Sequence, residues 1–186
     1  MKGFRYNGQL NGQNTPATLK YIIANSQTVT IGDAINLVGG YATVAGAGAK
    51  VMGIVVGIIT QKGLGLEIVT PGTDYDGTFT AGGAGVGTYV ATSDNATDKK
   101  VMVEVIVDKD ATFVNDADGD LVVADLGVFF DVVAASDQID QSSKLTTDGQ
   151  FQLVGFDPLG DADASVGLFK IAESQLDPYA QIVSGS

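Results

Sequence analysis

The chain has 186 residues, no cysteine, no histidine and a formal net charge of -12 at pH 7. Without thiols it forms no disulfide or thiolate metal site, and without imidazoles it lacks the commonest general base and metal ligand. These absences close most familiar hydrolase mechanisms to the chain alone, so we expect no enzymatic activity. Its acidic excess opposes a phosphate backbone, so we expect no nucleic-acid binding.

Residues 1–26 are polar and rich in turn signals, among them two Asn-Gly pairs. We interpret this segment as an extended N-terminal arm. Phe4, Arg5, Tyr6 and Leu10 are its candidate contact residues, because a purely solvated tail has no use for two aromatic rings. The alternative is a frayed terminus. The segment also lacks the apolar stretch of a secretion signal, so we expect synthesis in a cytoplasm.

Residues 27–108 are expected to form a first β-rich module. Apolar and polar residues alternate over Thr28–Val38, and the pair Gly39-Gly40 marks a tight turn. The apolar run Val51–Ile59 is too short to span a membrane and predicts a central strand covered on both faces. Val101–Val107 closes the module as a further strand. Close-set strands with glycine turns predict a small β-barrel or β-sandwich, and hence a mainly β fold class.

A glycine-rich stretch within this module, Ala81–Gly87, invites comparison with a phosphate-binding loop. No Gly-Lys-Ser/Thr follows it, and the next segment has strand character, so no helix N-terminus is expected to hold an anion. We therefore predict no nucleotide site and no cofactor.

Residues 109–186 are expected to form a second β-rich module. Its strands are predicted at four apolar runs joined by Asp- and Gly-rich turns. These runs are Leu121–Ala124, Val128–Val133, Phe151–Val154 and Gly167–Ile171.

Two clusters in the second module carry closely spaced carboxylates: Asn115–Asp120, and the looser group Asp157, Asp161 and Asp163. Such spacing suits a hard cation such as Ca²⁺, although the glutamate of an EF-hand is missing. The competing interpretation is that Asp and Gly are simply the residues that tight turns require. We assign no catalytic residue and no metal ligand.

The string Gly-Asp-Ala-Ile-Asn-Leu-Val-Gly-Gly-Tyr-Ala-Thr-Val-Ala-Gly, residues 32–46, is followed by Val-Met-Gly-Ile-Val-Val-Gly at 51–57. This pattern resembles the small β-barrel of head-decoration (capsid cement) proteins of tailed bacteriophages. Residues 149–161 and 167–176 are similar to segments of phage virion structural proteins. The second module is a departure from the shortest members of that group.

The resemblance implies a non-enzymatic protein, often a homotrimer, on the outer surface of the expanded capsid. Its partner would be the major capsid protein, whose subunits it bridges against internal DNA pressure, and residues 27–108 would bind the capsid. The alternative is a receptor- or glycan-binding module of a virion fibre that uses the Asp-rich loops to hold calcium. If the arm makes the capsid contact, deleting residues 1–13 should leave a folded protein that no longer binds.

Overall fold

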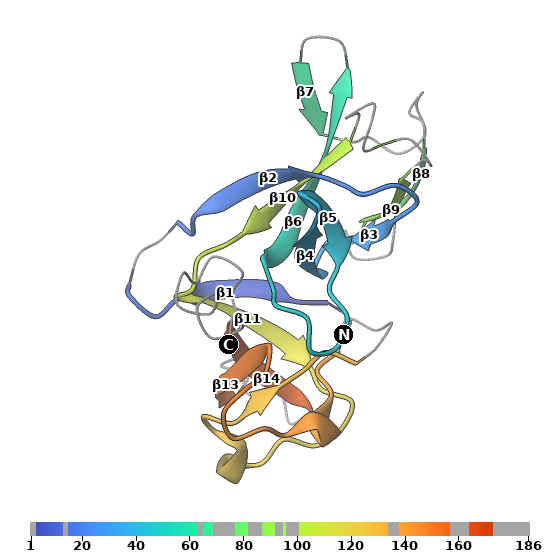
Figure 1. Cartoon of the computed structure of the whole chain (residues 1–186). Helices are drawn as coiled ribbons and strands as arrows, with labels where there is room; N and C mark the ends of the chain where they lie inside the picture. Colours follow the sequence, from blue (N-terminus) through green and yellow to red (C-terminus); the bar gives the residue numbers. More distant parts are fainter. Residues whose placement is uncertain are drawn as a thin grey trace, which may run out of the picture.

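Antiparallel β-strands build most of the described chain and form three sheets (Figure 1). The computed structural model describes residues 3–12, 15–62, 65–68, 77–81, 87–91, 95, 101–133, 138–156 and 164–172. The expected mainly β fold class is confirmed. Two short 3-10 helices, η2 (Val123–Asp125) and η3 (Gln141–Ser143), lie among the strands of the second module.

A six-stranded sheet forms the centre of the first module. β6 lies between β10 and β4, so the apolar run predicted as a central strand occupies that place. Beyond the body of the sheet, β7 pairs with the far end of β6, and the two strands project outward together (Figure 1). The strands in spatial order are β2 (Thr18–Ile22), β10 (Val101–Ile106), β6 (Gly53–Lys62), β4 (Ala34–Val38) and β5 (Tyr41–Val44), with β7 (Gly65–Ile68) on β6.

A three-stranded sheet, ordered β3-β9-β8, completes the first module. Val29 of β3 and Tyr89 of β9 pair across the strands, and both are buried in the same core as Ile35 and Val55 of the six-stranded sheet. The bounds of these strands are β3 (Thr28–Thr30), β9 (Gly87–Ala91) and β8 (Gly77–Ala81).

The six-stranded sheet curls until its first and last strands approach one another. Ile23, just after β2, forms one isolated parallel bridge with Ala42 of β5, and the Ala24 N–H donates to the Ala42 carbonyl at 2.9 Å. A single bridge is not a ladder, so in the described part of the chain the predicted barrel is not closed. The packed sheets fit the sandwich form instead.

A five-stranded antiparallel sheet forms the second module. Buried and partly exposed side chains alternate along β13, where Phe151 and Leu153 face the core. β13 and β14 confirm two of the four strands predicted here, and the short β12 lies within the third predicted run, Val128–Val133. The spatial order is β1 (Arg5–Gln9), β11 (Ala111–Asp116), β14 (Val166–Ile171), β13 (Phe151–Phe156) and β12 (Phe129–Phe130).

The two modules share a hydrophobic core. Ala34, Ile54 and Ile106 pair across β4, β6 and β10, so they form one row on one face of the six-stranded sheet. All three belong to the same buried cluster as Phe113 and Phe151 of the five-stranded sheet. Their chain neighbours, such as Ile35 and Val105, point to the opposite face and enter the first-module core, because successive side chains alternate along a strand. The six-stranded sheet is therefore covered on both faces at this end.

Gln150 fastens the same junction with polar contacts. Its fully buried side chain donates to the carbonyls of Gly46 at 2.8 Å and Ala49 at 2.6 Å, both in the loop after β5. Its Oε1 accepts a hydrogen bond from the Val132 N–H at 2.8 Å, within the second module. One side chain thus ties the two modules together and satisfies three backbone groups.

The segment predicted as an N-terminal arm, residues 1–26, is built into both modules over its described part. β1 pairs with β11, with Arg5 opposite Val114, and becomes the outer strand of the five-stranded sheet. β2 pairs with β10 along its whole length in the six-stranded sheet. The prediction of a separate arm is therefore wrong for the described residues. The partner strands lie far along the chain, where local composition carries no information about them.

The expected module boundary at residue 108 coincides with a change of sheet. β10 ends at Ile106 in the six-stranded sheet, and β11 begins at Ala111 in the five-stranded sheet. Among the described residues, no helix is long and apolar enough to cross a membrane.

Candidate functional surface

The four predicted contact residues do not form one surface. Phe4 is only 3% exposed and lies in the shared core. Its ring stacks on Phe151 with centroids 4.3 Å apart and meets Phe113 edge-on at 6.2 Å. An aromatic side chain packed in this way stabilises the fold and is not available to a partner.

The other three residues lie on or just beyond β1, which is the outer strand of the five-stranded sheet in the described part of the chain. Tyr6 is half-buried and packs edge-on against Phe113 at 6.3 Å. Arg5 is exposed, and Leu10, just beyond β1, is 57% exposed. Of the four residues, Arg5 and Leu10 are therefore the exposed ones.

The Gly32-Asp33 turn, which carries part of the resemblance, holds the N-terminal segment in place. The Phe4 N–H donates to the Gly32 carbonyl at 2.8 Å. Gly32 has φ of +100°, and a Cβ there would stand 3.0 Å from the Phe4 carbonyl oxygen and 3.1 Å from the Gly3 Cα. Asp33 stabilises the same turn by accepting from the Thr30 N–H at 2.7 Å. The sequence predicts the turn correctly but gives no sign of the segment that packs on it.

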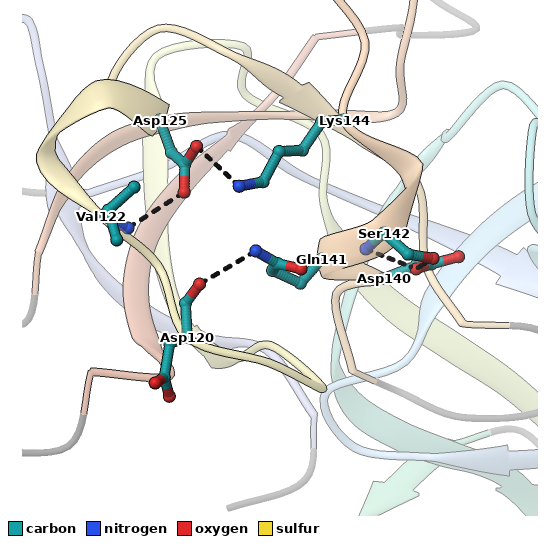
Figure 2. A network of polar contacts seen from close by, with 7 residues as sticks. All are labelled: Asp120, Val122, Asp125, Asp140, Gln141, Ser142 and Lys144. Carbon is teal, nitrogen blue, oxygen red and sulfur yellow. Dashed lines mark hydrogen bonds and ion pairs between the residues drawn. The ribbon is translucent and has the colours of Figure 1, made fainter.

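The acidic cluster Asn115–Asp120 is divided between a strand and a turn. Asn115 and Asp116 end β11, so the turn interpretation of the cluster is wrong for these two residues. Asp118 follows the strand and accepts a hydrogen bond from the Gln141 N–H at 2.7 Å. The Gln141 side chain donates back to the Asp120 carbonyl at 3.0 Å (Figure 2). These bonds tie the turn to η3.

Asp140 and Asp125 hold the two 3-10 helices. Asp140 begins η3 and accepts from the Ser142 N–H at 2.9 Å and from its hydroxyl at 2.6 Å. Asp125 lies in η2, accepts from the Val122 N–H at 2.9 Å and forms an ion pair with Lys144, also at 2.9 Å (Figure 2). The Asp125–Lys144 pair joins η2 to the residue that follows η3.

Desolvation raises the pKa of Asp125, but it is outweighed by two neighbours. The Val122 N–H and the hydrogen bond and charge of Lys144 stabilise the carboxylate, so its pKa lies below the ordinary value for aspartate. Asp125 is therefore ionised at neutral pH and serves as a fixed anchor for Lys144.

The described residues contain no group of three or more acidic side chains placed to hold a metal ion. Asp118, Asp125 and Asp140 instead accept hydrogen bonds from nearby backbone N–H groups. The second acidic cluster, Asp157, Asp161 and Asp163, lies outside the described residues. So do residues 82–86 of the glycine-rich stretch Ala81–Gly87. In the described part, the acidic turns thus have the structural role that turn chemistry predicts.

An exposed aliphatic cluster, here called the distal patch, gathers at the same place. It consists of Val122, Val123, Leu126 and Leu145, and Val123 is the most open of them at 76%. The η2 part of the patch, yellow in Figure 1, lies at the lower end of the second module. The Asp125–Lys144 ion pair holds the two segments of the patch side by side.

The sequence predicts the first part of this patch incorrectly. The pattern predicts a strand over Leu121–Ala124, yet only Leu121 of this run is buried, and the next residues turn outward into η2. The sequence does contain evidence against a strand here, because turn-forming glycines lie close to both ends of the run. Gly119 precedes the run, and Gly127, with φ of +84°, follows it, which leaves little length for a strand.

A comparison of the chain with protein-family models, curated proteins and solved structures finds no match in any of the three.

Proposed function

We propose that the chain is a structural virion protein that binds the outer surface of the expanded capsid of a tailed bacteriophage and stabilises contacts between major capsid subunits. The observation that carries the proposal is the use of acidic side chains in the second module to hold turns. Asp118, Asp125 and Asp140 accept backbone hydrogen bonds, and Asp125 also pairs with Lys144. Side chains used in this way favour a building block over an enzyme or a calcium-dependent receptor.

The shared core supports the same conclusion on mechanical grounds. A cement protein has to transmit force between the capsid subunits it bridges, so its two ends should not move independently. Here the row Ala34, Ile54 and Ile106 packs into one cluster with Phe113 and Phe151, and the buried Gln150 bonds across the junction. A close-packed interior of this kind resists compression and transmits strain.

Assembly as a homotrimer is part of the proposal. The chain carries a net charge of -12, so a multicopy particle coated with it is kept soluble by mutual repulsion. Several copies joined together engage several capsid subunits at once, which raises the effective concentration without new kinds of contact.

The test is co-sedimentation of the purified full chain with expanded heads and with compact precursor heads of its source phage. We expect saturable binding to expanded heads and none to precursor heads, with the chain alone remaining in the supernatant as the control. Absence of binding to either form would overturn the proposal and direct attention to receptor or glycan binding.

A further inference from the structure

We propose that the distal patch is the surface that docks on the capsid, and that it fits a protein surface whose exposed aliphatic side chains are rimmed by lysine and arginine. This inference rests on the proposed function and names the part of the molecule that makes the contact. It places the principal contact in the second module. The N-terminal residues are replaced because Phe4 is buried, and residues 27–108, which the resemblance implies as the capsid-binding module, are replaced because the patch lies outside them.

The patch combines exposure with continuity. Val122, Val123 and Leu126 follow one another through η2, with exposed fractions of 52%, 76% and 45%. Leu145 lies on a neighbouring segment, which the backbone bonds between Leu145 and Phe129 and the Lys144–Asp125 ion pair join to the η2 segment. Clustered aliphatic side chains with a polar rim mark an interaction site, whereas single exposed ones need no explanation.

The patch is also held in shape before any partner arrives. The Gly127 N–H, directly after Leu126, donates to the Leu153 carbonyl of β13 at 2.8 Å. Leu145 and Phe129 exchange two backbone hydrogen bonds, at 2.9 and 3.0 Å. Because the backbone under the patch is fixed, docking orders few further groups, and less of the binding free energy is lost to that ordering.

The charges around the patch determine what kind of surface it fits. Asp118 and Asp120 precede η2, Asp148 follows Leu145 by three residues, and all three are exposed. Lys144 lies next to the patch, and Asp125 neutralises its charge. A second copy docking patch to patch would place like charges opposite each other, which is unfavourable. A partner with a basic rim is complementary.

The experiment compares two valine-to-aspartate variants in binding to expanded heads. Val123→Asp places a charge in the patch, and Val38→Asp places the same charge on the first module, where Val38 is 59% exposed at the end of β4. We expect Val123→Asp to weaken binding by about tenfold or more, as loss of a central apolar anchor does, while Val38→Asp binds like the wild type. Leu145→Asp tests the other segment of the patch and should weaken binding in the same direction.

Salt provides the second readout. Wild-type binding should weaken as ionic strength rises from about 0.05 to about 0.3 M, because rim charges are screened over that range. Asp120→Asn combined with Asp148→Asn should reduce this dependence on salt.

Three outcomes would overturn the inference, and they are distinguishable. If Val123→Asp and Leu145→Asp bind heads as the wild type does, the patch is not the capsid contact, and the proposed function is unaffected. Failure of the wild type to bind heads would overturn both. Loss of the oligomer in Val123→Asp, measured by sedimentation equilibrium, would assign the patch to a contact between copies.

Discussion

Replacing Phe4 by alanine is the most direct test of whether the N-terminal segment is a folded strand or a free arm. Phe4 is 3% exposed, stacks on Phe151 and meets Phe113 edge-on in the shared core. Truncation of a buried phenylalanine costs about 3–5 kcal/mol through lost transfer free energy and the cavity left behind. Domains are stable by only about 5–15 kcal/mol, so we expect a large part of the stability to be lost.

The assay is urea-induced unfolding of the purified chain, followed by far-ultraviolet circular dichroism. Leu10→Ala is the matched control, since Leu10 is an exposed apolar residue of the same segment and its truncation should change the free energy of unfolding by less than about 0.5 kcal/mol. A change below about 1 kcal/mol for Phe4→Ala would refute the reasoning, because a free arm adds nothing to the folded body.

Hydrogen exchange tests whether β1 is paired with β11, because only the strand next to β1 should lose protection when β1 is loosened. β1 pairs with β11 across residues that include Tyr6 and Phe113. Loosening β1 by Phe4→Ala should therefore accelerate exchange over Ala111–Asp116, while β2, which pairs with β10 in the other sheet, keeps its protection. Equal acceleration in both sheets would mean global unfolding and not local release of β1.

Three further predictions concern single positions. Gly32→Ala forces a side chain against the backbone of the N-terminal segment at positive φ and should lower the free energy of unfolding by about 1–3 kcal/mol. Gly8→Ala is the control in the same urea assay and should be nearly neutral, because a Cβ at Gly8 would meet nothing within 4 Å. Gln150→Ala leaves the buried Val132 N–H without its partner and removes two part-buried bonds to the Gly46 and Ala49 carbonyls, so it should cost about 1–3 kcal/mol. Gln152→Ala loses one exposed bond and should cost less than about 1 kcal/mol. Asp125→Asn should lower the free energy of unfolding by about 1 kcal/mol at neutral pH. Because the folded pKa of Asp125 is depressed, the difference should hold above the unfolded value of about 3.9 and shrink as pH falls through the folded pKa; a gap unchanged at about pH 3 would contradict this.

The first module is the part best predicted from sequence, because its signals are local. Alternation over Thr28–Val38 gives β3 and β4, and the turn between β4 and β5 falls on Gly39-Gly40, whose φ angles are +60° and +86°. The apolar run at 51–59 lies in and just before β6, between β10 and β4. Each of these features depends on residues within a few positions of one another, so a single sequence contains the information.

The errors fall where the partner is distant in sequence. Residues 5–9 look polar and irregular, yet β11 provides a ladder for them and the core provides a pocket for Phe4. The opposite error occurs at Val122 and Val123, where a run of apolar residues predicts burial and the chain turns them outward. Composition predicts how apolar a segment is, but only the tertiary arrangement determines whether a core is available to it.

These two errors together change where a partner should be sought. Aromatic residues near the terminus suggested an arm that reaches outward, but the packing of Phe4 and the pairing of β1 commit that segment to the protein's own core. Val122 and Val123, which the sequence assigned to a strand, are open to solvent on a backbone already fixed by Asp125 and Lys144. Burial of apolar surface is the main favourable term in association, and surface already buried in folding contributes nothing further to it. The distal patch, and not the N-terminal aromatic residues, is therefore the stronger candidate for apolar contact with a partner.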